Sequence, residues 1–472
     1  MVAGVVLVIL VCQVMPVTFF HPVLLALLPL LFALLAALAA GSLLQPVETM
    51  EVSSMTSKRL FNSNFTFLIL GQISSLAGNY TLKFALSMYI LEQTGSATLF
   101  ASLLAAAMVP TILISPFGGI LADRADRRMV MVGLDACSGA AVLLAALALP
   151  KGHDIAVIAV LLVVLSILAA FESPTVQACV PQMLPEERVL QGNAVVNQVS
   201  AIASMVTPFL GSLFYTAFGI QPVFYAAVAC FFLTALLEYL IHLPPVASEN
   251  HLGLRAILRD DFAATLRFLR REQPAIVKLL LLAALASFFV AGTVVVGFPY
   301  LVRTVLGLSA SHYGAAESAM GVAAILGGLL VGLLSQKFRP RHLTAVFLLL
   351  GLCLLPAGAA FLVPLGSWSR YLILMAAFCV CQMGCSVFST YSITLIQART
   401  PAQLMGKVMS CVFTLSMCAQ PLGQLIYGAL FNRFAACVYW VLIPSGLILC
   451  VIGCGSAGFL ARLRENQVGP IK

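Results

Sequence analysis

The chain has 472 residues, of which 61% are hydrophobic and 9% are charged, and its formal net charge is +8. A soluble globular protein has about 25% charged residues, so this composition excludes a soluble enzyme or binding module and indicates an all-α polytopic membrane protein. The positive net charge fits lysines and arginines gathered at one membrane surface. We therefore expect the chain to contact membrane lipids and not to bind nucleic acid.

An apolar extension occupies residues 1–49. Residues 2–44 are almost wholly apolar and are interrupted by Pro16, Pro22 and Pro29. This pattern fits one long span, two short spans or a broken hairpin, and it also fits translation from an upstream start site. A secretory signal is not expected, because no basic segment precedes the apolar run.

Twelve further apolar runs follow, each of roughly 20 residues or more, which is enough for a helix to cross a hydrocarbon core about 30 Å thick. They divide the chain into a six-helix half at 50–243, a cytoplasmic linker at 244–276, and a second six-helix half with a short tail at 277–472. The predicted spans are 65–91, 98–122, 129–149, 155–180, 193–218, 222–243, 277–302, 313–334, 343–363, 371–397, 408–431 and 436–460.

The linker contains a stretch with helical amphipathic spacing. Between 252 and 272, Leu254, Ile257, Leu258 and Phe262 alternate with five arginines. This arrangement predicts a helix that lies on the inner leaflet and tethers the two halves. A plain solvated linker helix is the alternative.

Basic residues predict the orientation of the core. If Lys58 and Arg59 are cytoplasmic, most of the 25 lysines and arginines fall on the cytoplasmic side, and the outer side receives only Lys151, Arg303, Arg370 and Arg433. The positive-inside bias then places both ends of the twelve-helix core in the cytoplasm.

A short charged turn, which we call the gate loop, connects the second and third runs. It reads Gly118-Gly119-Ile120-Leu121-Ala122-Asp123-Arg124-Ala125-Asp126-Arg127-Arg128. Its charges must meet water at one membrane face, where they can hold helix ends together or release them. We assign cytoplasmic gating to a set completed by an acid in the third run: Gly119, Asp123, Arg124, Arg127, Arg128 and Asp135.

The second half repeats the first. One constant shift in residue number places Gly119 on Gly332, Asp123 on Gln336 and Arg128 on Arg341. Two six-helix halves related by an axis along the membrane normal are a transporter plan that places cargo at their interface. The repeat therefore favours a transporter over a membrane enzyme or receptor.

The gate loop resembles the G-x-x-x-D-R-x-G-R-R loop of the major facilitator superfamily, although Asp126 stands where that family usually has glycine. Further segments resemble its bacterial branch that includes macrolide-efflux and enterobactin-export proteins. These segments are Tyr89–Ala97, Phe171–Pro174, Val180–Glu187 and Gln397–Pro401, with Lys407 where the branch often has arginine.

The resemblance implies a monomeric secondary transporter of the bacterial plasma membrane. It would export a small amphipathic molecule, such as a macrolide or a siderophore, by alternating access and proton antiport, and could confer antibiotic resistance. No cofactor is expected, and the proton gradient would drive transport. A lipid or lysophospholipid transporter and a non-transporting membrane sensor remain as alternatives.

Polar residues inside spans are costly in lipid, so they predict a water-filled or cargo-lined cavity. Gln72, Asn79 and Lys83 share roughly one face of the first run. Lys83 lies about 16 Å below the outer end of that run, where it would bind an anionic group or pair with a carboxylate. Asn197 and Gln382 complete the predicted substrate cavity, although such residues are more often helix–helix contacts.

Glu172 is the candidate for proton coupling, because it precedes Ser173-Pro174, where proline loosens the backbone pairing of the fourth run. Glu238 lies nearer the inner surface and is interpreted as a boundary residue. Glu317 is expected to pair with Arg303.

Neither metal binding nor enzymatic activity is expected. Cys379, Cys381 and Cys385 come nearest to a metal pattern, but they lie in one apolar run without a nearby histidine. The sequence also has no G-x-S-x-G elbow and no nucleotide-binding loop.

Overall fold

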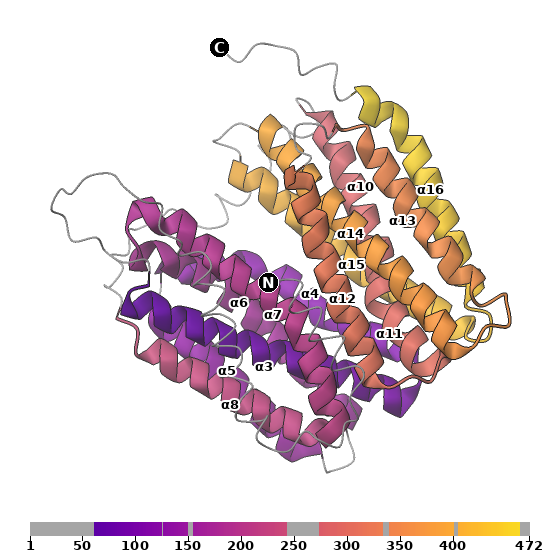
Figure 1. Cartoon of the computed structure of the whole chain (residues 1–472). Coiled ribbons are helices and arrows are strands. Elements are labelled where there is room, and N and C mark those ends of the chain that lie inside the picture. Colours follow the sequence, from indigo (N-terminus) through magenta and orange to yellow (C-terminus); the bar gives the residue numbers. More distant parts are fainter. Residues whose placement is uncertain are drawn as a thin grey trace, which may run out of the picture. The chain divides into compact units, whose positions relative to one another are not determined.

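The computed structural model describes residues 61–124, 126–149, 154–242, 273–333, 339–400 and 405–462. The described part is built of helices, which Figure 1 colours from indigo to yellow along the chain. Outside the described residues lie the apolar extension at 1–49, the amphipathic linker stretch at 252–272 and residues 334–338 of the second-half counterpart of the gate loop.

Each predicted span of the first half coincides with a helix. These helices are α3 (Ser63–Thr94), α4 (Ala97–Arg124), α5 (Arg127–Ala148), α6 (Asp154–Met183), α7 (Glu186–Phe218) and α8 (Ile220–Tyr239). Several extend beyond the predicted limits by a turn or two, because helices continue into the polar residues at the membrane surface.

The second half is also helical, but its first span is irregular. That span runs through α10 (Pro274–Val290), the π-helical segment η4 (Ala291–Gly297), α11 (Phe298–Tyr300) and the π-helical segment η5 (Leu301–Val305). The others are α12 (Ala310–Leu333), α13 (His342–Ala359), α14 (Ser367–Arg399), α15 (Met405–Arg433) and α16 (Tyr439–Arg462).

The chain forms two compact units, and the units do not divide at the linker alone. The first unit contains residues up to 86 together with 114–247, and the second contains 87–113 together with 248–472. The end of α3 and most of α4 therefore pack with second-half helices. Thr98 Oγ1, for example, donates to Gly428 O at 3.1 Å.

Ten of the described helical segments are long and apolar enough to cross a membrane. Helix α3 is not among them, and it carries Gln72, Asn79 and Lys83. These three are among the polar residues that lower the hydropathy of α3.

In the first unit, α3 packs closely against α8. Ser74 Oγ donates to Cys230 O at 2.9 Å, and Thr234 Oγ1 donates to Gly71 O at 3.1 Å. Gly78 permits this approach, because a Cβ there would lie 2.9 Å from Cys230 Cβ. Small residues and interhelical hydrogen bonds are the usual means of packing helices in lipid, and here they fix the face of α3 next to these serines.

In the second unit, α10 and η4 pack against α15 through glycines. A Cβ at Gly292 would overlap the Tyr427 ring, and a Cβ at Gly423 would overlap the backbone oxygen of Phe288. Tyr427 also shares a 2.6 Å hydrogen bond with Ser445 of α16. The backbones can therefore approach closely only because these positions lack side chains.

Candidate functional site

A serine of α3 connects two carboxyl groups inside the first unit. Ser75 Oγ lies 3.2 Å from Asp135 Oδ1 of α5 and 3.3 Å from Glu172 Oε1 of α6. Ser75 is 2% exposed and Asp135 is 1% exposed. The structure thus brings the proton-coupling candidate Glu172 and the predicted gate residue Asp135 together through a side chain that the sequence analysis did not single out.

The position of Asp135 follows from the face of α5 that the first unit buries. Met131, Asp135, Ser138 and Val142 recur at helical spacing along that face. The helix begins at Asp126, whose side chain accepts hydrogen bonds from the backbone N–H groups of Arg128 and Met129. Asp126, the departure from the family's usual glycine, is therefore an N-cap.

A third carboxyl group completes this buried group. Glu238 of α8 is 0% exposed and lies close enough to Asp135 to interact with it electrostatically. Its carboxyl lies close enough to that of Asp135 to share a hydrogen bond, although neither oxygen of Glu238 forms a hydrogen bond of good geometry among the described residues. Glu238 is thus enclosed, and its interpretation as a boundary residue was wrong. We call Ser75, Asp135, Glu172 and Glu238 the carboxyl cluster.

Lys83 provides a positive charge beside the cluster. It lies in the 32-residue helix α3, its side chain is exposed, and its ammonium is close enough to Glu172 to interact electrostatically. Glu172 therefore interacts with Lys83 on one side and with the enclosed Ser75–Asp135 contact on the other.

The other predicted cavity residues differ in exposure. Gln72 is buried and its Nε2 has no hydrogen-bond partner among the described residues, and the same holds for Oδ1 of the half-buried Asn79. Asn197 on α7 is exposed. Gln382 is half-buried on α14 and belongs to the second unit. Their common role in a substrate cavity stays a prediction.

The arginines of the gate loop bind the ends of neighbouring helices in the first unit. Arg127 Nη1 donates to Ala178 O of α6 at 2.9 Å. Arg128 donates to Tyr239 O at the end of α8, and its guanidinium carbon lies 4.8 Å from the centre of the Tyr239 ring. The helix α4 is described through Arg124, but the side chains of Asp123 and Arg124 and the surroundings of Gly119 lie outside the described residues.

The predicted Glu317–Arg303 pair was wrong. Arg303 forms an ion pair with Glu92 at the end of α3 and also donates to Leu308 O. Glu317 instead forms a hydrogen bond with Tyr313, one turn earlier on α12. The prediction failed because it paired residues by depth within neighbouring spans and did not anticipate that the end of α3 joins the second unit.

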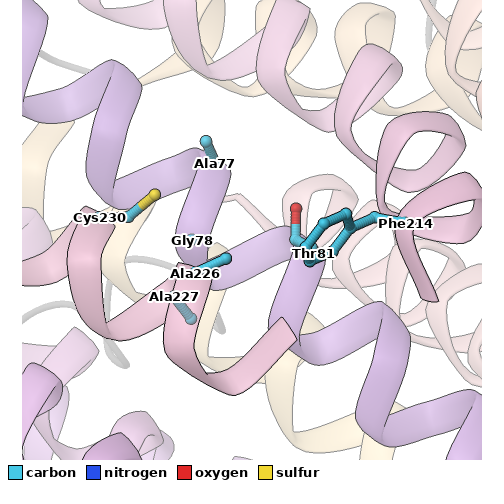
Figure 2. Close-up of a pocket in the computed structure, with 7 residues that line it drawn as sticks. All are labelled: Ala77, Gly78, Thr81, Phe214, Ala226, Ala227 and Cys230. Atoms are coloured by element: carbon cyan, nitrogen blue, oxygen red, sulfur yellow. The ribbon is translucent and has the colours of Figure 1, made fainter. Parts of the chain in front are cut away.

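A small pocket lies between α3, α7 and α8 of the first unit, with a volume of about 30 Å³. Figure 2 shows its lining by Ala77, Gly78, Thr81, Phe214 and Ala226 together with Ala227 and Cys230. Its volume is about that of one water in the liquid, so this pocket is too small for a drug-sized cargo. Among the described residues, no three histidine, cysteine or acidic side chains form a group that could hold a metal ion.

Solved structures with the same arrangement of helices are membrane transporters. A bacterial homologue of the human lysosomal transporter Spinster, in an inward-facing and unoccupied conformation, matches with a TM-score of 0.68 and 16% identity, covering 88% of this chain and 100% of that one. A bacterial homologue of the iron transporter ferroportin, in an inward-facing state, matches with a TM-score of 0.66 and 15% identity, covering 85% of this chain and 100% of that one. At these identities the likeness establishes the fold alone.

Sequence relatives include efflux proteins. Macrolide efflux protein A of Streptococcus pyogenes is 25% identical over 385 residues, which cover 81% of this chain and 92% of the relative. The multidrug efflux pump Tap of Mycobacterium tuberculosis is 27% identical over 423 residues, which cover 87% and 96% of the two chains.

The family model of the Major Facilitator Superfamily matches residues 68–424. This match includes the gate loop, the carboxyl cluster, the second to tenth predicted spans and most of the first and the eleventh. The chain is a multi-pass membrane protein that belongs to the Major Facilitator Superfamily.

Proposed function

We propose that this protein is a secondary active transporter that exports a small amphipathic molecule, such as a macrolide or a siderophore, in exchange for protons. Export is supported by the macrolide and multidrug efflux relatives. Proton exchange is supported by one observation in the structure, the position of Glu172 between Lys83 and Ser75. A carboxyl group in this position can hold a proton or, once it is ionised, pair with the neighbouring lysine.

The proposed cycle uses alternating access of the two halves. When Glu172 is ionised, it attracts Lys83 and limits the lysine's freedom to bind cargo. A proton that enters from outside neutralises Glu172 and releases Lys83, which then binds a polar or anionic group of the cargo. Since the charge of the pair differs between these two states, proton binding favours one conformation over the other.

In this proposal the gate loop controls the cytoplasmic side. Arg127 and Arg128 already bind the ends of α6 and α8, and Asp123 together with Arg124 would join helix ends across the closed gate. The Asp123→Asn variant is therefore expected to transport more slowly while it still folds and inserts. Wild-type transport by this variant, measured at wild-type abundance in membranes, would remove Asp123 from the gate.

The same proposal places a monomer in the bacterial plasma membrane with both ends of the core in the cytoplasm. Its central test is export of a macrolide, a catecholate siderophore and a cationic dye from cells that express the full chain, with and without a protonophore. We expect export of at least one compound, and loss of that export when the protonophore collapses the gradient. Export that persists without a gradient would contradict antiport.

The absence of export for all three compounds, with membrane insertion confirmed, would contradict the proposed cargo class. The direct follow-up is transfer of a fluorescent lysophospholipid between leaflets of vesicles that contain the protein. A positive result there would assign a lipid cargo instead.

A further inference from the structure

The hydrogen bonds of Ser75 limit the protonation states of its two carboxyl neighbours. A serine hydroxyl has one hydrogen to donate and two lone pairs that accept. Ser75 Oγ lies within hydrogen-bond distance of Asp135 Oδ1 and of Glu172 Oε1. If both acids were ionised, one of these contacts would place two oxygens together with no hydrogen between them. Both contacts become hydrogen bonds when one acid keeps its proton and donates it to Ser75 Oγ.

The charges around the cluster lead to the same conclusion. Asp135, Glu172 and Glu238 would together carry three negative charges, and only Glu172 has a lysine, Lys83, as a neighbour. Glu238 is also within electrostatic range of the thiol of Cys179. Burying an ionised carboxylate without a partner is costly, and two carboxylates that share one site do not both ionise readily.

Further charged groups lie at the edge of the cluster. Arg127 and Asp126 at the start of α5 interact electrostatically with Cys179, and they carry opposite charges. Arg127 also donates to Ala178 O. Arg128, which donates to Tyr239 O, adds a second positive charge at this edge. Among the described residues, however, neither oxygen of Glu238 forms a hydrogen bond of good geometry with any of these groups.

We propose that Ser75 is a proton relay between Asp135 and Glu172, and that Glu238 remains protonated as the neutral end of the same cluster. In the relay step, the Asp135 O–H bond breaks and its proton passes to Ser75 Oγ, while the proton of Ser75 passes to Glu172 Oε1. Ser75 is neutral before and after the step, Asp135 becomes ionised and Glu172 becomes neutral. The relay rests on the proposed proton antiport, whereas the protonation of the cluster does not.

The arrangement assigns different tasks to Glu172 and Asp135. Glu172 is the acid that interacts with Lys83, so it exchanges protons with the transport cycle. Asp135 is enclosed and keeps a proton available through Ser75. Because the two hydrogen-bonded states differ only in which acid carries the proton, the relay can switch without movement of the helices.

Adjacent serines supply a matched pair of variants for the test. Ser74 is also buried on α3, but it donates to the backbone oxygen of Cys230 and not to a carboxyl group. Ser75→Ala removes the bridge, Ser74→Ala removes a comparable hydroxyl from the same helix, and Ser75→Thr keeps a hydroxyl at the bridge. Thermal unfolding of the purified proteins checks that all three variants fold.

The first measurement is the infrared carboxyl C=O band of the full chain in lipid bilayers, recorded across a pH titration. We expect a protonated-carboxyl band at neutral pH that shifts in Ser75→Ala, loses intensity in Glu238→Gln, and is unchanged in Ser74→Ala. No protonated-carboxyl band at neutral pH, or the same spectrum for Ser75→Ala and the wild type, would overturn the proposal. This result does not depend on any cargo.

The second measurement compares proton-driven export with cargo exchange at equal pH on both sides, using the compound that the wild type exports. We expect Ser75→Ala to reduce proton-driven export by about 100-fold, the low end of what a positioned proton-transfer group supplies, and to retain exchange. Ser75→Thr should restore export. Equal losses of export and exchange in Ser75→Ala would reject the relay, and a wild type that exports nothing would reject the proposed function while leaving the infrared result to stand.

Discussion

The two compact units of this transporter differ in how they use polar residues. The first unit encloses three acids from three helices around one serine. The second half has only Glu317 and Glu465 as acidic residues beyond position 272, and Glu317 is bonded to Tyr313 of its own helix. Its helices approach through glycines that face aromatic rings and backbone.

This difference indicates a division of labour between the units. Buried carboxyl groups are retained in membranes at a cost, and they mark functional sites by default. Glycines at a contact let two helices pack closer together without adding charge. We therefore propose that proton binding takes place in the first unit, and that the second unit depends mainly on close packing of its helices.

The largest effect is expected when one acid in each unit is neutralised, because this tests which unit carries the proton coupling. We expect Glu172→Gln to abolish export driven by a pH gradient, because the glutamine cannot exchange a proton. Glu317→Gln should keep most of that export, because Glu317 is bonded within its own helix. Export by both variants is measured at matched abundance with an imposed pH gradient. Retained coupling in Glu172→Gln, or its loss in Glu317→Gln alone, would reverse the assignment.

A glycine substitution in the second unit tests the importance of shape. A methyl group at Gly423 would overlap the backbone oxygen of Phe288, which cannot move aside as a side chain could. We expect Gly423→Ala to destabilise the protein by about 1–3 kcal/mol and to lower its Tm. Gly455→Ala is the control, since a Cβ there meets nothing within 4 Å, and alanine favours the helix by up to about 1 kcal/mol.

The cap of α5 tests whether every acid of the first half takes part in coupling. Asp126 accepts hydrogen bonds from two backbone N–H groups at the start of the helix. We expect Asp126→Ala to cost about 1 kcal/mol of stability and to leave the number of protons moved per cargo unchanged. Asp126→Asn, which keeps a capping oxygen, should be close to wild type. A changed proton ratio in either variant would extend the coupling machinery to the gate loop.

The smallest effect is expected at the ion pair of the second unit. Glu92 and Arg303 are both partly exposed, and exposed pairs contribute about 0.2–1 kcal/mol. We expect Glu92→Gln to lower Tm only slightly and to leave pH-gradient-driven export intact. A loss of export as large as that in Glu172→Gln would place essential charge chemistry in the second unit as well.

The sequence was sufficient to predict the helices and the family. Runs such as 155–180 and 371–397 contain enough apolar residues to identify a span without any structure. Their ends were less predictable: α7 begins at Glu186, seven residues before the predicted span, because a helix continues into polar surface sequence. The π-helical segments η4 and η5 were not predicted, since the apolar pattern of that span gives no sign of them.

The candidate site was predicted in part. Glu172, Asp135 and Lys83 were identified as ionisable residues within spans, a signal that a single sequence provides. Ser75 was missed because a serine in a span usually bonds its own helix or a neighbouring backbone. Glu238 was misinterpreted because its depth was judged from distance to the end of the span, whereas its enclosure depends on packing of α8 against α3 and α5. An acid within an apolar run was the signal that could have found it.

The most direct test of this account measures proton and cargo movement in the same vesicles. The full chain is reconstituted with a pH-sensitive dye inside, and a compound that it exports is supplied on one side with no initial pH gradient. We predict that protons move opposite to the compound in the wild type, and that Glu172→Gln moves the compound down its gradient without any proton movement. Transport of the compound by the wild type with no opposing proton flux would contradict the account.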